Sequence, residues 1–158
     1  EVPEDYTKEE RRKDILCYTT EPLAEDVIIT GDMTAELYVS SSAPDTDFVV
    51  RVTDVDENGR SIKLADGVLS ARYRSGFERA KFLEAGEIAC LKIRTTKLSN
   101  CFRKGHRIRV TVTSGAENFI FPNSNTREGY NSTVTVVAEN TLHHGGIHAS
   151  KLVVRVEE

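Results

Sequence analysis

Hydrophobic and polar residues alternate along short segments of the chain, a pattern typical of β-strands that bury one face. In residues 34–40, Ala35, Leu37 and Val39 fall on one face, and polar residues fall on the other. Residues 48–55 alternate in the same way. Further strands are predicted from β-branched or alternating runs at residues 15–19, 27–30, 61–64, 68–73, 87–97, 106–113, 133–138 and 151–156.

Signals for turns and helices are few. Asn58-Gly59 lies between two predicted strands and is the strongest hairpin signal in the chain. Short helices are expected only at residues 8–14 and 76–85. Many short strands with little helix predict an all-β sandwich, and the uneven connections without a Cys-Trp-Cys framework favour a jelly roll over an immunoglobulin-like domain. We expect a charged lead-in at residues 1–14 and one β-sandwich domain at residues 15–158.

Composition and charge narrow the class of protein. A chain of 158 residues fits one domain. The net charge of −4 comes from interspersed charges of both signs, so neither a nucleic-acid partner nor a membrane partner is expected. The charged residues Arg51, Lys92 and Arg94 are interpreted as protecting exposed strand edges. The three cysteines show no C-x-x-C spacing, which predicts reduced, buried thiols and a cytoplasmic protein.

One segment resembles a calcium-binding loop. Residues 54–59 match the first six positions of an EF-hand loop. The twelfth position, where the loop needs a bidentate Glu, is Ala65, and strands rather than helices are predicted on both sides. We therefore favour a solvated hairpin turn over a calcium site.

Two aspartates and a histidine-rich segment are further candidates. Asp45 and Asp47 could be paired carboxylates for acid–base work or metal binding, but Asp after Pro and before a strand is also ordinary turn chemistry, in which the side chain bonds nearby backbone amides. His144 and His148 have the i, i+4 spacing of zinc ligands on a helix, but two glycines between them disfavour a helix. We favour a loop in which His143 and its neighbours bond to backbone carbonyls.

Catalytic and cofactor motifs are not found. No serine stands in a G-x-S-x-G nucleophile elbow, and His106 has no neighbouring Ser or Asp that would reveal a triad. No G-x-G-x-x-G segment or phosphate loop suggests a cofactor. We therefore expect no catalytic residue, metal site or cofactor in this chain.

Several long motifs, in order over about nine tenths of the chain, carry a family resemblance. They are residues 18–31 (similar to Y-T-S-E-P-L-x-E-D…T-G), 40–48 (S-S-x-A-P-D-T-D-F), 54–60 and 66–74, 105–110 (G-H-R-I-R-L), and 143–152 (H-H-G-x-x-H-x-S-x-L). On these motifs the chain resembles the C-terminal domain of the Xaa-Pro dipeptidyl-peptidase and cocaine-esterase (CocE/NonD) hydrolases.

The resemblance implies a galactose-binding-like jelly roll that packs beside an upstream α/β-hydrolase domain. The catalytic triad would lie in that upstream domain, so this fragment alone would not be an enzyme. The longer chain would hydrolyse esters, amides or dipeptides with Pro in the second position. This domain would support the catalytic domain, help to wall its pocket and contribute contacts between copies of the longer chain.

One segment departs from the family pattern N-F-P-x-[YF]-D-R-N-x-N-T-G. Residues 118–126 lack two positions and the Asp-Arg pair. We therefore do not expect this loop to keep a salt bridge that it makes elsewhere in the family, and we expect the neighbouring pocket to differ in shape. Elsewhere we expect Arg72 and Arg74 on one strand face with a carboxylate partner, and an ionic cluster of Asp47, Asp54 and Arg72 or Arg107. The structural or interface candidates are Asp45, Asp47, Asp54, Arg72, His106, Arg107, Asn125, His143 and His148.

Two other functions remain open. Jelly rolls often bind sugars, and a carbohydrate-binding module would need exposed aromatic platforms. The chain has no Trp, so the candidates would be Tyr6, Tyr38, Tyr73 and Tyr130. A stand-alone metalloenzyme would instead use the histidines of residues 143–148.

Overall fold

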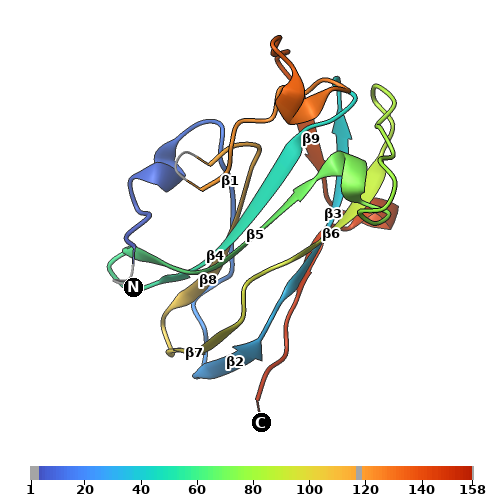
Figure 1. Cartoon of the computed structure of the whole chain (residues 1–158). Coiled ribbons are helices and arrows are strands. Elements are labelled where there is room, and N and C mark those ends of the chain that lie inside the picture. Colours follow the sequence, from blue (N-terminus) through green and yellow to red (C-terminus); the bar gives the residue numbers. More distant parts are fainter. Residues whose placement is uncertain (1–3, 117–118, 158) are drawn as a thin grey trace.

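The computed structural model describes residues 4–116 and 119–157, and its regular structure consists of β-strands and short 3-10 turns (Figure 1). The strands are β1 (Leu16–Thr19), β2 (Val27–Gly31), β3 (Thr34–Ser41), β4 (Asp47–Val55), β5 (Ser61–Ser70), β6 (Ala89–Arg94), β7 (Leu98–Phe102), β8 (Arg107–Thr113), β9 (Asn140–His143) and β10 (Lys151–Val153). The 3-10 turns are η1 (Glu9–Arg11), η2 (Ala71–Tyr73), η3 (Gly129–Asn131) and η4 (Gly146–His148). Over the described residues, no helix has the length and hydropathy needed to span a bilayer.

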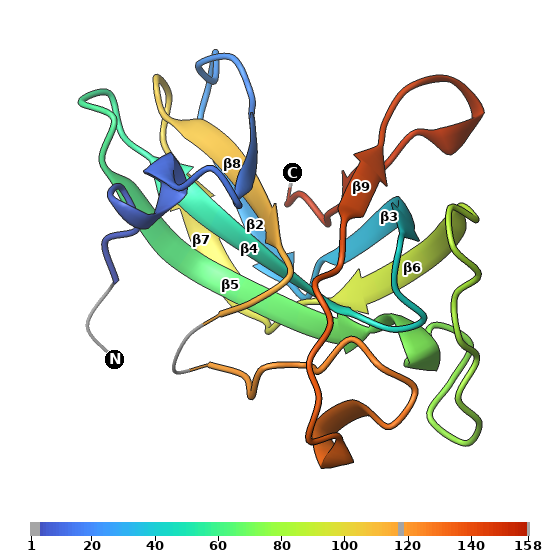
Figure 2. The same ribbon diagram turned by 90° about the horizontal axis from the view of Figure 1, so that it is seen from above.

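The strands form two sheets and a ribbon. The first sheet has the antiparallel order β1-β8-β4-β5. In the second sheet β3 pairs with β6 on one side. On its other side β3 pairs with β10 near its start and with β9 near its end. β2 and β7 form a ribbon that continues β3 and β6. Figure 2 shows the two sheets on opposite sides of the molecule, so the predicted β-sandwich is confirmed, whereas the jelly-roll topology stays a prediction.

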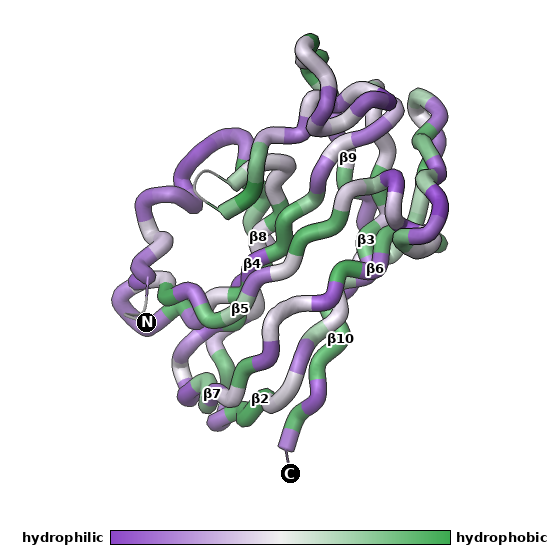
Figure 3. Tube along the Cα trace, viewed as in Figure 1, coloured by the Kyte–Doolittle hydropathy of each residue, from purple (hydrophilic) through white to green (hydrophobic). Residues whose placement is uncertain are grey.

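The core lies between the sheets because the alternating residues of facing strands meet there. Ala35, Leu37 and Val39 of β3 point inward, as predicted, and pack with Phe48 and Val50 of β4. None of the five is more than 4% exposed. Each large apolar side chain buried in this way contributes roughly 1.5–3 kcal/mol. Burial also alternates along β6, and Figure 3 shows hydrophobic and hydrophilic residues following one another in the second half of this strand, Leu91 to Arg94.

The outer face of β4 is also covered, which the alternation did not predict. Val49, Arg51 and Thr53 are at most 8% exposed. The lead-in covers part of this face: Thr53 and Ser61 donate hydrogen bonds to the Glu10 carboxylate at 3.2 and 2.8 Å. Arg51 therefore lies on an interior strand, and its interpretation as an exposed edge residue is wrong.

Several other elements differ from the sequence prediction. Residues 61–64 and 68–73 belong to one strand, β5, which ends at Ser70 and is followed by η2. Residues 133–138 form no strand, residues 76–85 form no helix, and the helix expected at 8–14 is only the turn η1. β7 and β9 were not predicted. Such errors arise because a strand forms only where a neighbour offers a partner.

The three cysteines are free, as expected, but Cys17, Cys90 and Cys101 are all exposed. The prediction that their thiols are buried is therefore wrong. Cys90 and Cys101 occupy exposed positions in the alternating burial of β6 and β7, and all four residues of the edge strand β1, including Cys17, are exposed.

Candidate functional site

A buried ion pair joins the start of β4 to the turn η2. The Asp45 side chain is 1% exposed and the Arg72 side chain 12%. Arg72 donates hydrogen bonds to the Asp45 carboxylate from its Nε at 2.7 Å and from its backbone amide at 2.8 Å. The expected carboxylate partner of Arg72 is thus present. However, Arg72 lies on η2 rather than on a strand, and the amide that Asp45 meets is 27 residues away rather than in a local turn.

Asp47, which is fully buried, belongs to the same cluster. Its Oδ1 accepts hydrogen bonds from Ser70 Oγ at 2.5 Å and from Asn123 Nδ2 at 2.8 Å. Its Oδ2 accepts from the Tyr130 hydroxyl at 2.9 Å. Asn123 Nδ2 also lies 3.0 Å from Asp45 Oδ2 and bridges the two carboxylates. All four carboxylate oxygens therefore accept at least one hydrogen bond from within the protein.

The electrostatics of this cluster are those of two buried carboxylates with one guanidinium. Neutral donors offset the excess negative charge, since charges removed from water must be paired or hydrogen-bonded. Partial burial and the neighbouring Asp47 carboxylate raise the pKa of Tyr130, so its hydroxyl keeps the proton that it donates.

The cluster fixes the long loop between β8 and β9. Arg72 Nη2 donates to the carbonyl of Thr126 at 2.8 Å. Gly129 has φ +63°, and a Cβ there would come within 2.8 Å of Arg72 Nη2, so only glycine allows this approach. Asn125 also has a left-handed φ of 61°, which Asn tolerates, and its Nδ2 donates to the carbonyl of Val136 at 2.8 Å. The altered family segment is held in this loop, although Asn118 lies outside the described residues.

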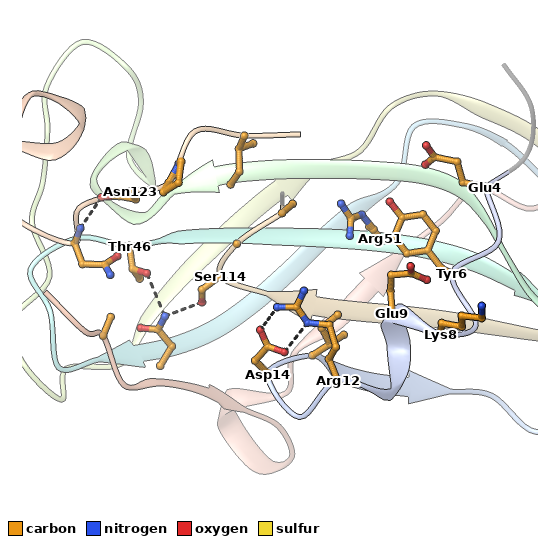
Figure 4. Close-up of a pocket in the computed structure, with 18 of the residues that line it drawn as sticks. Glu4, Tyr6, Lys8, Glu9, Arg12, Asp14, Thr46, Arg51, Ser114 and Asn123 are labelled. Carbon is orange, nitrogen blue, oxygen red and sulfur yellow. Dashed lines mark hydrogen bonds and ion pairs between the residues drawn. The ribbon is translucent and has the colours of Figure 1, made fainter. Parts of the chain in front are cut away.

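A groove of about 1110 Å³ separates this loop from the lead-in. Figure 4 shows Arg51 in this groove beside Tyr6. The Arg51 guanidinium carbon lies 4.7 Å from the Tyr6 ring centroid and 5.8 Å from that of Phe119. Thr46 and Asn123 line the same groove, so it adjoins the Asp45–Asp47 cluster.

The remaining predicted ionic residues lie elsewhere. Asp54 Oδ1 is 2.8 Å from His106 Nδ1, which joins β4 to the start of β8. Arg107 donates to the carbonyl of Thr20 at 2.9 Å and lies 3.8 Å from the carboxylate of Glu21. The single ionic cluster expected from the sequence is therefore wrong: Asp47 and Arg72 share one cluster, whereas Asp54 and Arg107 have separate partners.

The histidine loop connects β9 and β10 along the edge of β3. His143 Nε2 is 2.8 Å from Ser40 Oγ, so its partner is a hydroxyl and not the expected backbone carbonyl. His148 packs against Tyr38, with ring centroids 5.3 Å apart, and its buried Nδ1 has no hydrogen-bond partner among the described residues. Across residues 4–116 and 119–157, no three His, Cys, Asp or Glu side chains are grouped to hold a metal ion.

The other candidates from the sequence have structural roles. Asp56 closes the predicted hairpin by accepting hydrogen bonds from the amides of Asn58 and Arg60 at 2.8 and 2.9 Å, and Gly59 has φ +83°. The four tyrosines considered as sugar platforms have different neighbours. Tyr6 faces Arg51, Tyr38 faces His148, Tyr73 faces Phe77 and Tyr130 bonds Asp47.

Three residues that matter here were missed by the sequence reasoning. Arg51 was interpreted as an edge charge, Asn123 as part of a shortened motif and Tyr130 as a candidate sugar platform. The only signal was the polar residue Arg51 within an otherwise apolar run, Val49 to Val52, which becomes meaningful once β4 is known to be an interior strand.

Comparisons with known proteins agree with this description. Residues 3–153 match the family model described as the X-Pro dipeptidyl-peptidase C-terminal non-catalytic domain. The cocaine esterase of Rhodococcus sp. (strain MB1 Bresler) is 42% identical over 150 residues, which cover 92% of this chain and 26% of that protein.

Solved structures show the same fold. An aminopeptidase from a marine sediment archaeon, Thaumarchaeota archaeon, superposes with a TM-score of 0.93 at 25% identity, covering 99% of this chain and 28% of that one. An α-amino acid ester hydrolase superposes with a TM-score of 0.91 at 24% identity, again over 99% of this chain and 28% of its own. The chain thus spans about a quarter of the length of the relatives that it matches.

Proposed function

The chain belongs to the family of X-Pro dipeptidyl-peptidase C-terminal non-catalytic domains, and from this premise we propose that it serves as the accessory domain of a larger serine hydrolase. In this role it supports an upstream α/β-hydrolase domain and helps to wall that domain's substrate pocket. The proposed activity of the longer chain is hydrolysis of esters, amides or Xaa-Pro dipeptides.

The observation that carries this proposal is how the buried carboxylates of Asp45 and Asp47 are hydrogen-bonded. All four oxygens of Asp45 and Asp47 accept hydrogen bonds, and their donors include Asn123 and Tyr130 of the β8–β9 loop. The cluster therefore stabilises a defined loop shape instead of presenting a reactive group. A loop held in this way is suited to forming a wall against a neighbouring domain.

The proposed setting is the cytoplasm. Three exposed cysteines without disulfides fit a reducing compartment, where thiols stay reduced. The partner that we propose is the hydrolase domain of the same longer chain. Contacts between copies of that chain are a further expectation from the family resemblance.

The test compares the longer chain with a version that lacks this domain. A chromogenic ester and a Gly-Pro amide report activity, and thermal unfolding reports stability. We expect deletion to lower both, and the added 158-residue chain to restore part of each. The substrate that responds then identifies the activity. An upstream part that is fully active and stable alone, and that does not bind the added chain, would contradict the proposal.

A matched pair of variants separates loop shape from general charge effects. Arg72→Met removes the cation that fixes the β8–β9 loop, whereas Lys92→Met removes a cation whose side chain is 70% exposed on the second sheet. The Arg72→Met chain should restore less activity than the wild type, and the Lys92→Met chain should restore the same amount.

A further inference from the structure

We propose that the groove floored by Arg51 is the docking site for the upstream hydrolase domain, which inserts a segment carrying a carbonyl or carboxylate oxygen onto the Arg51 guanidinium. The inference rests on the proposed function and adds to it the face and the residue through which the two domains join.

The first support is a buried guanidinium nitrogen without a hydrogen-bond partner. Arg51 is 8% exposed, yet its Nε is buried and has no hydrogen-bond partner among the described residues. A buried donor left without an acceptor is unfavourable. The aromatic faces of Tyr6 and Phe119 stabilise the guanidinium charge but do not accept a hydrogen bond as an oxygen would. An oxygen from a docked segment would remove this penalty.

The second support is the pairing of the other charges around the groove. Arg12 and Asp14 form an ion pair with each other. Glu4 pairs with Lys63, and Asp5 pairs with Arg60. Glu9 adds a further carboxylate to the groove lining, and Lys63 and, more weakly, Arg51 lower the pKa of Glu4. None of these acids accepts a hydrogen bond from Arg51 Nε, which leaves this nitrogen suited to an incoming acceptor.

The third support is the segment at residues 133–138. This segment lies beside the groove, and its last residue, Ala138, lines the groove. Its sequence is β-branched and strand-like, but within residues 4–116 and 119–157 it pairs with no strand. Val134 is 63% exposed and Val137 87%. The described hydrogen bonds of this segment involve Val134 and Val136, and none involves the backbone of Val137. A segment with exposed apolar side chains and a partly unpaired backbone is a surface against which another protein segment can pack.

Apolar residues continue this surface along the loop. Phe119 is 43% exposed and Phe121 is 85% exposed, on either side of the groove-lining residue Ile120. A central Arg with aromatic residues around it is the composition of energetically dominant interface residues. The occupant therefore has an oxygen acceptor flanked by apolar side chains.

Hydrogen–deuterium exchange of the 158-residue chain and of the full-length hydrolase tests the site directly. In the full-length protein, the amides of residues 119–121 and 133–138 should exchange at least about tenfold more slowly. The loop around Phe77, which is 78% exposed, should exchange equally in both. Slower exchange only on a different surface would overturn the groove as docking site and leave the accessory function standing. No slower exchange on any surface would overturn both proposals.

Variants then test the residues. Arg51→Met keeps the apolar stem and removes the donors. It should leave the melting temperature of the 158-residue chain unchanged or higher, and should abolish the slow exchange at residues 133–138 in the full-length protein. If Arg51 instead had a structural role, Arg51→Met would lower the melting temperature of both the 158-residue chain and the full-length protein. Phe121→Asp should also abolish the slow exchange, and its matched control Phe77→Asp should not. Equal effects of the two Phe variants would overturn the proposal.

Discussion

Replacing Arg72 by Met tests whether the buried ion pair holds the β8–β9 loop in place. The side chain of Asp45 is 1% exposed and that of Arg72 is 12% exposed, so the pair belongs with buried ion pairs. Removing one partner of such a pair typically costs about 3–5 kcal/mol, because a charge stays buried without compensation. The two other donors to Asp45, the Arg72 backbone amide and Asn123, remain, so we expect a loss near 3 kcal/mol.

The assay is urea unfolding of the 158-residue chain followed by circular dichroism, with thermal unfolding alongside. A loss of about 3 kcal/mol should lower the melting temperature by roughly 6–12 °C for a domain of this size. Lys92→Met is the control, because its exposed ion pair with Glu36 should contribute only about 0–1 kcal/mol.

A second variant identifies the buried charge as the cause. Asp45→Asn combined with Arg72→Met removes the unpaired charge and keeps an oxygen for the backbone amide of residue 72. The double variant should be at least about 1 kcal/mol more stable than Arg72→Met alone. The reasoning is refuted if Arg72→Met costs no more than Lys92→Met, or if the losses in the double variant simply add.

Two further predictions concern other parts of the fold. Gly67→Ala should lose about 1–3 kcal/mol of unfolding free energy, because its Cβ would lie 2.5 Å from the carbonyl oxygen of Arg94. The control Gly115→Ala should be near neutral, because no described atom lies within 4 Å of a Cβ placed there. Equal losses in the two variants would contradict this account. Hydrogen bonds from Thr7 and then from Arg60 lower the pKa of Asp5 from its ordinary 3.8 to about 2. Since the folded-state pKa is the lower one, the contribution of Asp5 to stability is complete above pH 3.8 and disappears as the pH falls through about 2. An NMR titration midpoint near 3.8 would contradict this.

The residues of the site show why a sequence could indicate its parts and not their arrangement. Asp45 and Asp47 stood out as a pair before a strand, but the partners that complete them are Arg72 and, 78 and 76 residues away, Asn123. Hydrogen-bond partners this distant along the chain are set by the packing of the loops on the first sheet. No spacing rule relates them, so the predicted cluster grouped Asp54 with residues that it does not contact.

Strand prediction succeeded and failed for a related reason. Alternation in residues 34–40 fixes which side chains of β3 face the core, because side chains alternate across any extended strand. The strand-like residues 133–138 have the same local preference, yet no strand in the described part of the chain pairs with them. Conversely, residues 140–143 carry little signal and become β9 because the edge of β3 is open to them.

The sequence by itself determined the class of the fold, the inward-facing residues of β3 and β4, the hairpin at Asn58-Gly59 and the family resemblance, all of which depend on local periodicity or on ordered motifs. Only the tertiary structure decided that the outer face of β4 is covered, that Arg51 is buried there, and that Arg72 meets Asp45. These depend on which distant segments come together, and on the loss of water around them, which turns an ordinary charge into one that needs a partner.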